Sequence, residues 1–270
     1  MPRRLQRLDA ELVRRGLARS REQAVELITA GRVQVRGIAA TKPASGVDND
    51  TPMRVIPDTD DPGYASRGGH KLAGALAAFP DIRVAGRRCL DAGASTGGFT
   101  DVLLRADAAE VVAVDVGYGQ LAWAVRSDER VRVVDRTNVR SLTPDQIGGP
   151  VALTVADLSF ISLGLVLPAL TACTEPGGDL LPMVKPQFEV GRDRLGGGGV
   201  VRDPQLRAET VLAVARAASE LGWYPSGVLR SPLPGPAGNV EFFLWLRRTD
   251  RAMIDDGQIA QIVTTAEEAP

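Results

Sequence analysis

A glycine-rich turn between two apolar runs carries the strongest chemical signal in this chain of 270 residues. The turn lies within Leu90–Thr100 and contains three glycines, Gly93, Gly97 and Gly98. Glycines leave no Cβ in the way where backbone N–H groups and a helix N-terminus approach a ligand. Asp115 ends the next apolar run, where its carboxylate can accept both hydroxyls of a ribose. This spacing predicts a strand, a turn and a helix that bind a nucleotide-like ligand.

The residues inside the turn discriminate between two such ligands. A dinucleotide site requires a glycine where this chain has Ser95, so there is less room for a pyrophosphate. Asp91 lies 24 positions before Asp115 and adds a negative charge that disfavours phosphates and suits a cation. S-adenosylmethionine has no phosphate but carries an ammonium, a sulfonium and a ribose. The turn therefore indicates a methyltransferase rather than a NAD-dependent enzyme, and a strand-to-helix turn that binds no ligand is the remaining alternative.

Charged residues also interrupt apolar segments elsewhere in the chain. Asp157 and Lys185 each follow a run of apolar residues, where a charge is costly unless it has a partner or a function. Lys71 falls in a predicted helix over residues 66–76, beside its buried face, and Glu241 opens a late apolar run. Taken singly, these last two would more often be solvated surface residues.

Alternating strands and helices must position these charges. Beyond the first two strands, five apolar runs are predicted to be strands: 131–134, 151–158, 180–184, 227–229 and 241–246. Helical patterns lie between them at 99–105, 121–126, 163–172 and 205–221. This order predicts an α/β fold with a doubly wound, mostly parallel sheet that binds ligands at the carboxyl ends of its strands. An antiparallel last strand would bring its first residue, Glu241, to the same edge as Asp157 and Lys185.

The composition excludes several other classes of protein. It is 44% apolar and 24% charged, which suits a full domain with a small appended one. Two cysteines in apolar runs, Cys89 and Cys173, predict buried thiols and no disulfide framework. With His70 as the only histidine, zinc chemistry and a Ser-His-Asp triad are nearly excluded, and no metal site is expected.

The start of the chain is basic but lacks the apolar core of a signal peptide, which predicts a cytoplasmic protein. The window 151–173 has Asp157 as its only charge, but Pro168 and small polar residues break it. We therefore expect a buried strand, a turn and a buried helix there rather than a membrane span. The sequence carries no signal for an oligomeric state.

The first 42 residues differ in charge from the rest of the chain. They contain ten Lys and Arg against four acids, a net charge of +6, while the whole chain has a net charge of −1. Leucines at helical spacing end at Gly16, and Ser20 with Gln23 predicts a capping box for a second helix over 21–30. Alternation at Val33 and Val35 and an apolar run at 53–56 predict short strands. Such a small basic α+β unit is expected to bind a polyanion.

This segment resembles the S4 RNA-binding module over about residues 5–57. The resemblance implies structured RNA as the ligand, and it makes five basic residues candidate phosphate contacts: Arg4, Arg7, Arg19, Arg21 and Lys42. A DNA-binding helix-turn-helix is the alternative, which the strand after the second helix disfavours. The turn-rich stretch 57–64 predicts a junction, with an RNA-binding domain over 1–58, a linker over 59–66 and a catalytic domain over 67–270.

Four charged residues, Lys71, Asp157, Lys185 and Glu241, resemble in order and setting the Lys-Asp-Lys-Glu tetrad of FtsJ-like ribose 2′-O-methyltransferases. Together with the S4-like segment and the runs Ser66-Arg-Gly-Gly-His-Lys71 and Lys185-Pro-Gln-Phe-Glu189, the whole chain resembles the TlyA family, also called haemolysin A. The resemblance implies a class I, Rossmann-like methyltransferase domain. It also implies 2′-O-methylation of cytidine in the ribosomal RNA of the small (16S) and large (23S) subunits, as in actinobacterial members.

The resemblance also implies roles for the residues. Lys185 would be the base or the group that steers the ribose hydroxyl, oriented by Asp157 and Glu241, while Lys71 would supply a like charge and help to hold the substrate. The residues expected to bind S-adenosylmethionine are Asp91, Gly93, Ser95, Gly97, Gly98 and Phe99 at its methionine end, Asp115 at its ribose and Asp135 near its adenine. Asp135 in a simple surface turn is an equal alternative.

Two further features lie near the expected site. Arg67 and His70 are expected to extend the RNA surface, with His70 as a phosphate contact rather than a proton shuttle. The segment 191–199 is too glycine-rich to be fixed by its own side chains, so it either folds over the substrate or has no function. Two other functions remain open: a non-catalytic RNA-binding factor of the ribosome and a pore-forming haemolysin.

Overall fold

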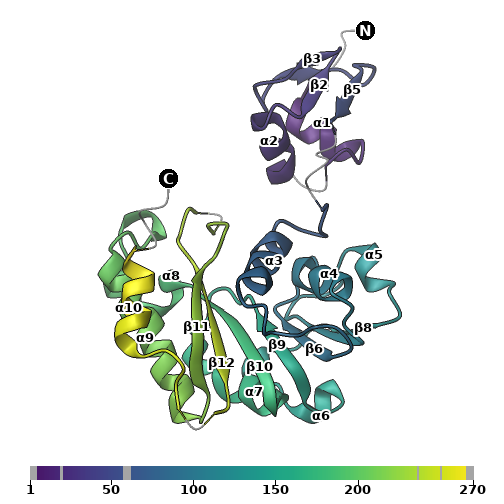
Figure 1. Cartoon of the computed structure of the whole chain (residues 1–270). Coiled ribbons are helices and arrows are strands. Elements are labelled where there is room, and N and C mark those ends of the chain that lie inside the picture. The colour runs from purple at the N-terminus through teal and green to yellow at the C-terminus, as the bar shows by residue number, and fades with distance from the viewer. Residues whose placement is uncertain (1–4, 19–20, 57–61, 236, 250, 266–270) are drawn as a thin grey trace. The chain divides into compact units, whose positions relative to one another are not determined.

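The chain forms two compact units, divided between Gly63 and Tyr64 (Figure 1). The computed structural model describes residues 5–18, 21–56, 62–235, 237–249 and 251–265. Arg4, Arg19 and the predicted capping residue Ser20 lie outside these ranges. The division falls inside the predicted linker, so residues 64–66 belong to the larger unit.

The first unit is a small α+β fold. Its helices are α1 (Leu8–Arg14) and α2 (Arg21–Thr29), and its three-stranded antiparallel sheet has the order β3 (Ile38–Ala39), β2 (Val33–Val35), β5 (Met53–Val55). A second pair joins β1 (Gln6–Arg7) to β4 (Gly46–Val47). The helices and sheet enclose one apolar cluster, which includes Leu8, Leu12, Leu27, Ile28 and Val33. Leu5, Leu8 and Leu12 share the helical spacing, but β1 occupies residues 6 and 7, so α1 begins only at Leu8 and Leu5 is exposed.

A seven-stranded sheet organises the second unit. Its order is β11-β12-β10-β9-β6-β7-β8 (Figure 1). The strands are β6 (Arg88–Ala92), β7 (Glu110–Val114), β8 (Val131–Val134), β9 (Val151–Ala156), β10 (Thr174–Val184), β11 (Tyr224–Arg230) and β12 (Phe242–Arg247). Strands β8, β7, β6, β9 and β10 run parallel, whereas β12 is antiparallel to both of its neighbours. The predicted doubly wound sheet with an antiparallel last strand is confirmed.

Helices cover both faces of this sheet. They are α3 (Gly68–Ala78), α4 (Gly98–Arg105), α5 (Trp123–Arg126), α6 (Pro144–Ile147), α7 (Leu167–Cys173), α8 (Pro186–Glu189), α9 (Pro204–Glu220) and α10 (Asp256–Thr265). The sequence did not predict α10, because only Ile259 and Val263 of this helix are buried, too few to mark its period. The window 151–173 folds as β9, a short 3-10 helix (η2, Leu163–Leu165) and α7.

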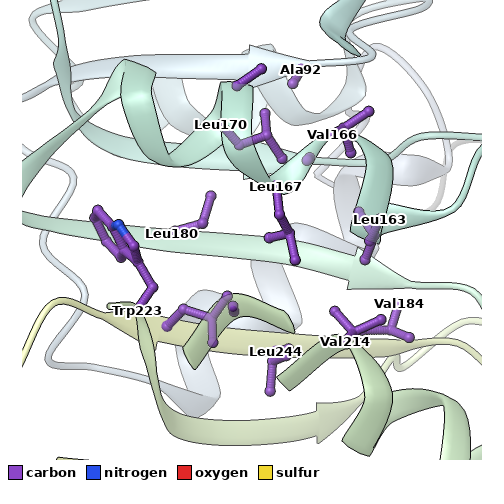
Figure 2. Packing of buried hydrophobic residues seen from close by; sticks show 14 of the residues in the cluster. Ala92, Leu163, Val166, Leu167, Leu170, Leu180, Val184, Val214, Trp223 and Leu244 are labelled. Carbon is purple, nitrogen blue, oxygen red and sulfur yellow. The ribbon is translucent and has the colours of Figure 1, made fainter. Parts of the chain in front are cut away.

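Alternation along the strands gives the sheet one apolar cluster on each face. In β6, Leu90 and Ala92 join one cluster, and Cys89 between Arg88 and Leu90 joins the other. Figure 2 shows Leu163, Leu167 and Leu170 of η2 and α7 gathered with Leu180 and Leu244 of the sheet. Leu170 is fully buried, so its truncation to alanine would cost about 2–5 kcal/mol. Among the described residues, no helix is both long and apolar enough to span a membrane.

Candidate active site at the carboxyl edge of the sheet

Two neighbouring parallel strands deliver the first charged pair. Asp157 directly follows β9, and Lys185 directly follows β10, so both lie at the carboxyl edge of the sheet. Lys185 Nζ is 2.6 Å from Asp157 Oδ1 and donates a hydrogen bond of 3.1 Å to Ser159 Oγ. The Lys185 side chain is 9% exposed and that of Asp157 is 22% exposed. This pair is therefore partly open to a substrate.

The second charged pair is sealed. Glu241 precedes β12, whose antiparallel direction brings it to the same edge, and Lys71 reaches it from α3 at 2.5 Å between Nζ and Oε2. The Glu241 side chain is 1% exposed and that of Lys71 is 9% exposed. Gln187, two residues after Lys185, donates to Glu241 Oε1 at 3.3 Å, and Met183 Sδ lies 3.9 Å from Lys71 Nζ. The two pairs thus share the segment 183–187.

The structure brings all four predicted charges to one edge but pairs them differently from the hypothesis. Glu241 contacts Lys71 rather than Lys185, so Asp157 is the carboxylate that directly orients Lys185. The sequence could place Asp157, Lys185 and Glu241 at strand ends, but the partner of Glu241 depends on how α3, which carries Lys71, packs across the sheet. Removing one member of a buried pair typically costs about 3–5 kcal/mol, because the other charge stays buried without compensation.

The glycine turn between β6 and α4 combines an unusual backbone with close packing. Gly93, Ser95 and Gly97 all have positive φ angles, of 89°, 46° and 93°. A Cβ on Gly93 would lie 2.6 Å from the backbone oxygen of Asp157, so this glycine lets the turn approach the end of β9. Gly98 likewise packs against the segment that opens α3, where its Cβ would meet Ser66 Oγ. The glycines therefore let the turn pack closely against the end of β9 and leave the backbone N–H groups of the turn accessible to a ligand. Phe99 is buried in the core.

Asp91 is a fully buried carboxylate beneath this turn. Thr100 Oγ1 donates to its Oδ2 at 2.7 Å, and its Oδ1 has no hydrogen-bond partner in the described part of the chain. Burial raises the pKa of Asp91 to about 7; the Thr100 bond lowers it, and the nearby carboxylates of Asp157 and Asp115 raise it further. Three carboxylates around one turn make a place that favours a cation and repels a phosphate.

Asp115 follows β7, where it accepts two backbone hydrogen bonds. Ser95 N donates to its Oδ2 at 2.8 Å, and Gly117 N donates to its Oδ1 at 2.7 Å. Each carboxylate oxygen has a second lone-pair site, so acceptor capacity remains for hydroxyl groups. Asp135 accepts from Gly119 N at 3.2 Å and pairs with Arg126 at 3.3 Å, which ties it to the loop after Asp115.

A buried asparagine outside the predicted site residues holds the end of the glycine-rich segment. Asn239, 2% exposed, accepts from Val201 N at 3.0 Å through Oδ1 and donates to Gly199 O at 2.9 Å through Nδ2. It lies two residues before Glu241, in the loop that leads to β12. The end of the segment is therefore held from outside. Arg194 inside the segment also pairs with Glu209 of α9, so the expectation that its own side chains could not fix it was too strict.

An aromatic pair stands beside the open charged pair. Phe160 is 90% exposed and has a φ of 62°, and its ring centroid lies 5.1 Å from that of Phe188. An exposed phenylalanine in the left-handed region is rare and strained. Sequence reasoning missed both residues, because a phenylalanine next to an apolar strand looks like core.

The segment that opens the second unit packs onto α3 and α4. Ala65 N donates to Asp101 Oδ2 at 2.8 Å, and the guanidinium of Arg105 lies 5.0 Å from the Tyr64 ring centroid. His70 meets the same tyrosine ring edge-on at 5.1 Å and is half-buried, whereas Arg67 is exposed. The ring contact limits how far His70 can serve as a phosphate contact.

The described basic candidates of the first unit lie on its surface. Arg7 and Arg21 both pair with Asp9 at 2.9 Å, and their side chains are 51% and 60% exposed. These bonds hold the pKa of Asp9 well below its usual range, with the Arg7 bond as the largest cause. Lys42 is also exposed. The Asp9 carboxylate thus fixes two guanidinium groups that still face solvent.

Comparisons with known proteins agree with both units. Residues 6–50 match the S4 domain, and residues 64–248 match the FtsJ-like methyltransferases. The 16S/23S rRNA (cytidine-2′-O)-methyltransferase TlyA of Mycobacterium tuberculosis is 62% identical over 265 residues, 98% of each chain. Hemolysin A of Brachyspira hyodysenteriae is 33% identical, over 87% of this chain and 97% of its own. The solved structure of a hemolysin candidate from Streptococcus thermophilus is 38% identical, with a TM-score of 0.78 over 98% and 96% of the two chains.

Proposed function

The chain belongs to the FtsJ-like methyltransferases and, within them, to the TlyA family, and from this we propose that it methylates the ribose 2′-hydroxyl of cytidine in 16S and 23S ribosomal RNA. The observation that best supports this proposal is the Asp157–Lys185 ion pair, which is partly exposed to solvent and lies beside the glycine turn. The substrate is supported by the name of the relative that is 62% identical and by the S4 domain. A ribosomal substrate would place the protein in the cytoplasm.

The methyl donor we propose is S-adenosylmethionine. The residues at the turn fit it, because Asp91 has a buried carboxylate oxygen without a hydrogen-bond partner in the described residues and Asp115 retains acceptor capacity. Asp91 and the turn Gly93–Gly98 would hold the methionine end, Asp115 the ribose, and Asp135 the loop beside the adenine. When bound, this cofactor supplies a methyl group on a positively charged sulfur.

Lys185 is the residue we assign to the reacting hydroxyl. A ribose hydroxyl is a poor nucleophile, so its proton must leave as the oxygen attacks the methyl carbon. Lys185 Nζ would hold that oxygen and, as a neutral amine that has first lost its own proton to solvent, receive the hydroxyl proton, while Asp157 at 2.6 Å and Ser159 at 3.1 Å fix the nitrogen in place. Such fixed positioning is itself a large part of catalysis, because it removes the entropy cost of aligning the groups.

The buried Lys71–Glu241 pair stabilises the segment that carries Lys185. Glu241 neutralises Lys71, and Gln187 connects the pair to the segment that carries Lys185. Because this pair is buried, Lys71 would support the segment 183–187 rather than hold the substrate directly, the role that the sequence suggested. Phe160, exposed beside Asp157, would stack against a base of the bound RNA, as aromatic side chains commonly do.

RNA capture is assigned mainly to the first unit. Arg7, Arg21 and Lys42 are exposed there, and Arg4 and Arg19 remain proposed phosphate contacts outside the described residues. Arg67 and His70 would extend the RNA surface on the second unit. Lys and Arg side chains supply most of the salt-dependent affinity of such complexes.

The deciding experiment uses purified protein, labelled S-adenosylmethionine and separated ribosomal subunits. We expect label in the small and large subunit RNAs, mapped to cytidine 2′-oxygens, and loss of transfer by Lys185→Ala with cofactor and RNA binding retained. Near-native transfer by that variant would contradict the role of Lys185, and absence of label with the native protein would contradict the function. Naked ribosomal RNA in parallel shows whether an assembled subunit is required.

The hemolysin names of two relatives favour one second candidate, disruption of membranes. Leakage of a dye from liposomes by the purified protein, at concentrations that saturate methyl transfer, would support it. Intact liposomes under those conditions would exclude it for the isolated chain.

A further inference from the structure

Glu189 is a largely enclosed acid that the proposed mechanism does not use. It ends α8, four residues after Lys185, and its carboxylate accepts two short hydrogen bonds. Ser162 Oγ donates to Oε2 at 2.6 Å, and Leu163 N donates to Oε1 at 2.8 Å. Burial raises the pKa of this carboxyl, while the two bonds lower it. In the described part of the chain, no basic side chain forms an ion pair with it.

Both donors belong to the segment that carries Asp157. Ser162 caps η2 and Leu163 is its first residue, so the Glu189 carboxylate lies at the start of this short helix. The segments 157–163 and 185–189 are therefore joined at both ends. The Asp157–Lys185 pair connects them at one end, and the Glu189 bonds connect them at the other.

The residue midway along the first segment is strained. Phe160 has a φ of 62°, a conformation that costs about 1–3 kcal/mol for a residue of this kind and persists only where the surroundings enforce it. Its ring is 90% exposed and lies 5.1 Å from that of Phe188 between centroids, so apolar burial contributes little to holding it. The two bonds to Glu189 restrain the segment on the far side of Phe160.

We propose that Glu189 is a positioning residue: it anchors the segment 157–163 so that Asp157 stays against Lys185 and Phe160 stays exposed. It acts through the geometry of two accepted hydrogen bonds and neither touches substrate nor exchanges a proton in the reaction. The expected effect of Glu189 on methyl transfer rests on the proposed function. Its expected effect on the backbone of the segment 157–163 can be measured without that function.

Three variants separate geometry from charge. Glu189→Gln keeps an acceptor for the Leu163 N–H and can donate to Ser162 Oγ, whereas Glu189→Ala removes both bonds. Ser162→Ala removes one bond and serves as the milder variant if Glu189→Ala fails to fold. All three leave the four charged residues of the site unchanged.

The first readout needs neither cofactor nor RNA. Amide hydrogen exchange of residues 158–165 in the free protein should be about tenfold faster in Glu189→Ala, the effect of losing roughly one net hydrogen bond. Exchange in Glu189→Gln should stay within about twofold of the native protein. Unchanged exchange in Glu189→Ala would overturn the anchoring role, whatever the reaction proves to be.

The second readout is steady-state methyl transfer to ribosomal subunits. We expect kcat to fall roughly 10- to 100-fold in Glu189→Ala, as for other small misplacements of reacting groups, with the affinity for S-adenosylmethionine unchanged. Glu189→Gln should retain most of kcat, and its pH profile should match that of the native protein. A loss in Glu189→Gln as large as in Glu189→Ala would show that the charge or proton matters and would overturn the proposal. If the native protein transfers no methyl group, the proposed function fails, and the exchange result alone decides the anchoring role.

Discussion

The substitution Asp91→Asn should make the protein more stable and a poorer binder of its cofactor. Asp91 is fully buried, and burial raises the pKa of its carboxyl from 3.8 to about 7. Between these two values the native state keeps a proton that the unfolded chain has lost. Stability therefore falls as the pH rises through this window, and the full cost is present above pH 7.

The size of the effect follows from the shift. A change from 3.8 to about 7 is roughly three pKa units, and at about 1.4 kcal/mol per unit the ionised carboxylate costs up to about 4 kcal/mol at pH 8. At pH 4.5 only the first part of this pH window has been crossed, so the cost that has accumulated is about 1 kcal/mol. Asparagine has nearly the same shape and still offers Thr100 Oγ1 an acceptor. It should remove this cost without creating a cavity.

Urea unfolding followed by tryptophan fluorescence measures this directly. All three tryptophans, Trp123, Trp223 and Trp245, belong to the second unit, so the signal reports that unit alone. The variant should gain much more at pH 8 than at pH 4.5, and calorimetry should show weaker binding of S-adenosylmethionine. A variant less stable than the native protein at pH 8, or a gain of equal size at both pH values, would refute the reasoning.

Three further substitutions test other parts of the site. Asn239→Ala should lower kcat roughly tenfold and speed proteolysis after residue 191, because the hydrogen bonds to Gly199 and Val201 are lost. Native values of kcat and of the proteolysis rate would show that Asn239 does not hold this segment. Lys71→Met should cost about 3–5 kcal/mol in urea unfolding by leaving Glu241 unpaired, and adding Glu241→Gln should restore stability but not activity. Arg21→Ala should weaken ribosomal RNA binding and reduce the salt slope by about 1, whereas an unchanged slope would exclude a phosphate contact.

The sequence predicted the fold well because local signals and global topology agree. Apolar runs, the glycine turn and the Pro/Gly loop before β12 each specify an element, and the rule that sheet ligands lie at carboxyl ends then brings Asp157, Lys185 and Glu241 together. Short strands were less visible. The pair β1–β4 has two residues in each strand, too few to show any alternation.

Partner choice within the site was beyond the sequence for a physical reason. Whether Glu241 meets Lys71 or Lys185 depends on the packing of α3 across the sheet, which no local pattern encodes. Asn239 and Glu189 were missed because their partners lie far along the chain: two backbone groups for Asn239, and one backbone N–H and the Ser162 hydroxyl for Glu189. Such partners can be met by any suitable donor or acceptor.

The charges of the site also explain why the catalytic unit of this enzyme would need the basic first unit. Four acids, Asp91, Asp115, Asp157 and Glu241, surround the reacting edge, and the two lysines Lys71 and Lys185 are each paired with one of them. That excess suits a cationic cofactor but repels the phosphates of an RNA substrate. Affinity for RNA must then come from elsewhere, and the first 42 residues carry a net charge of +6 in a chain whose total is −1. If so, the second unit alone should bind S-adenosylmethionine with native affinity yet lose most of its salt-dependent affinity for ribosomal RNA. Native RNA affinity of that unit would mean that its own surface captures the substrate.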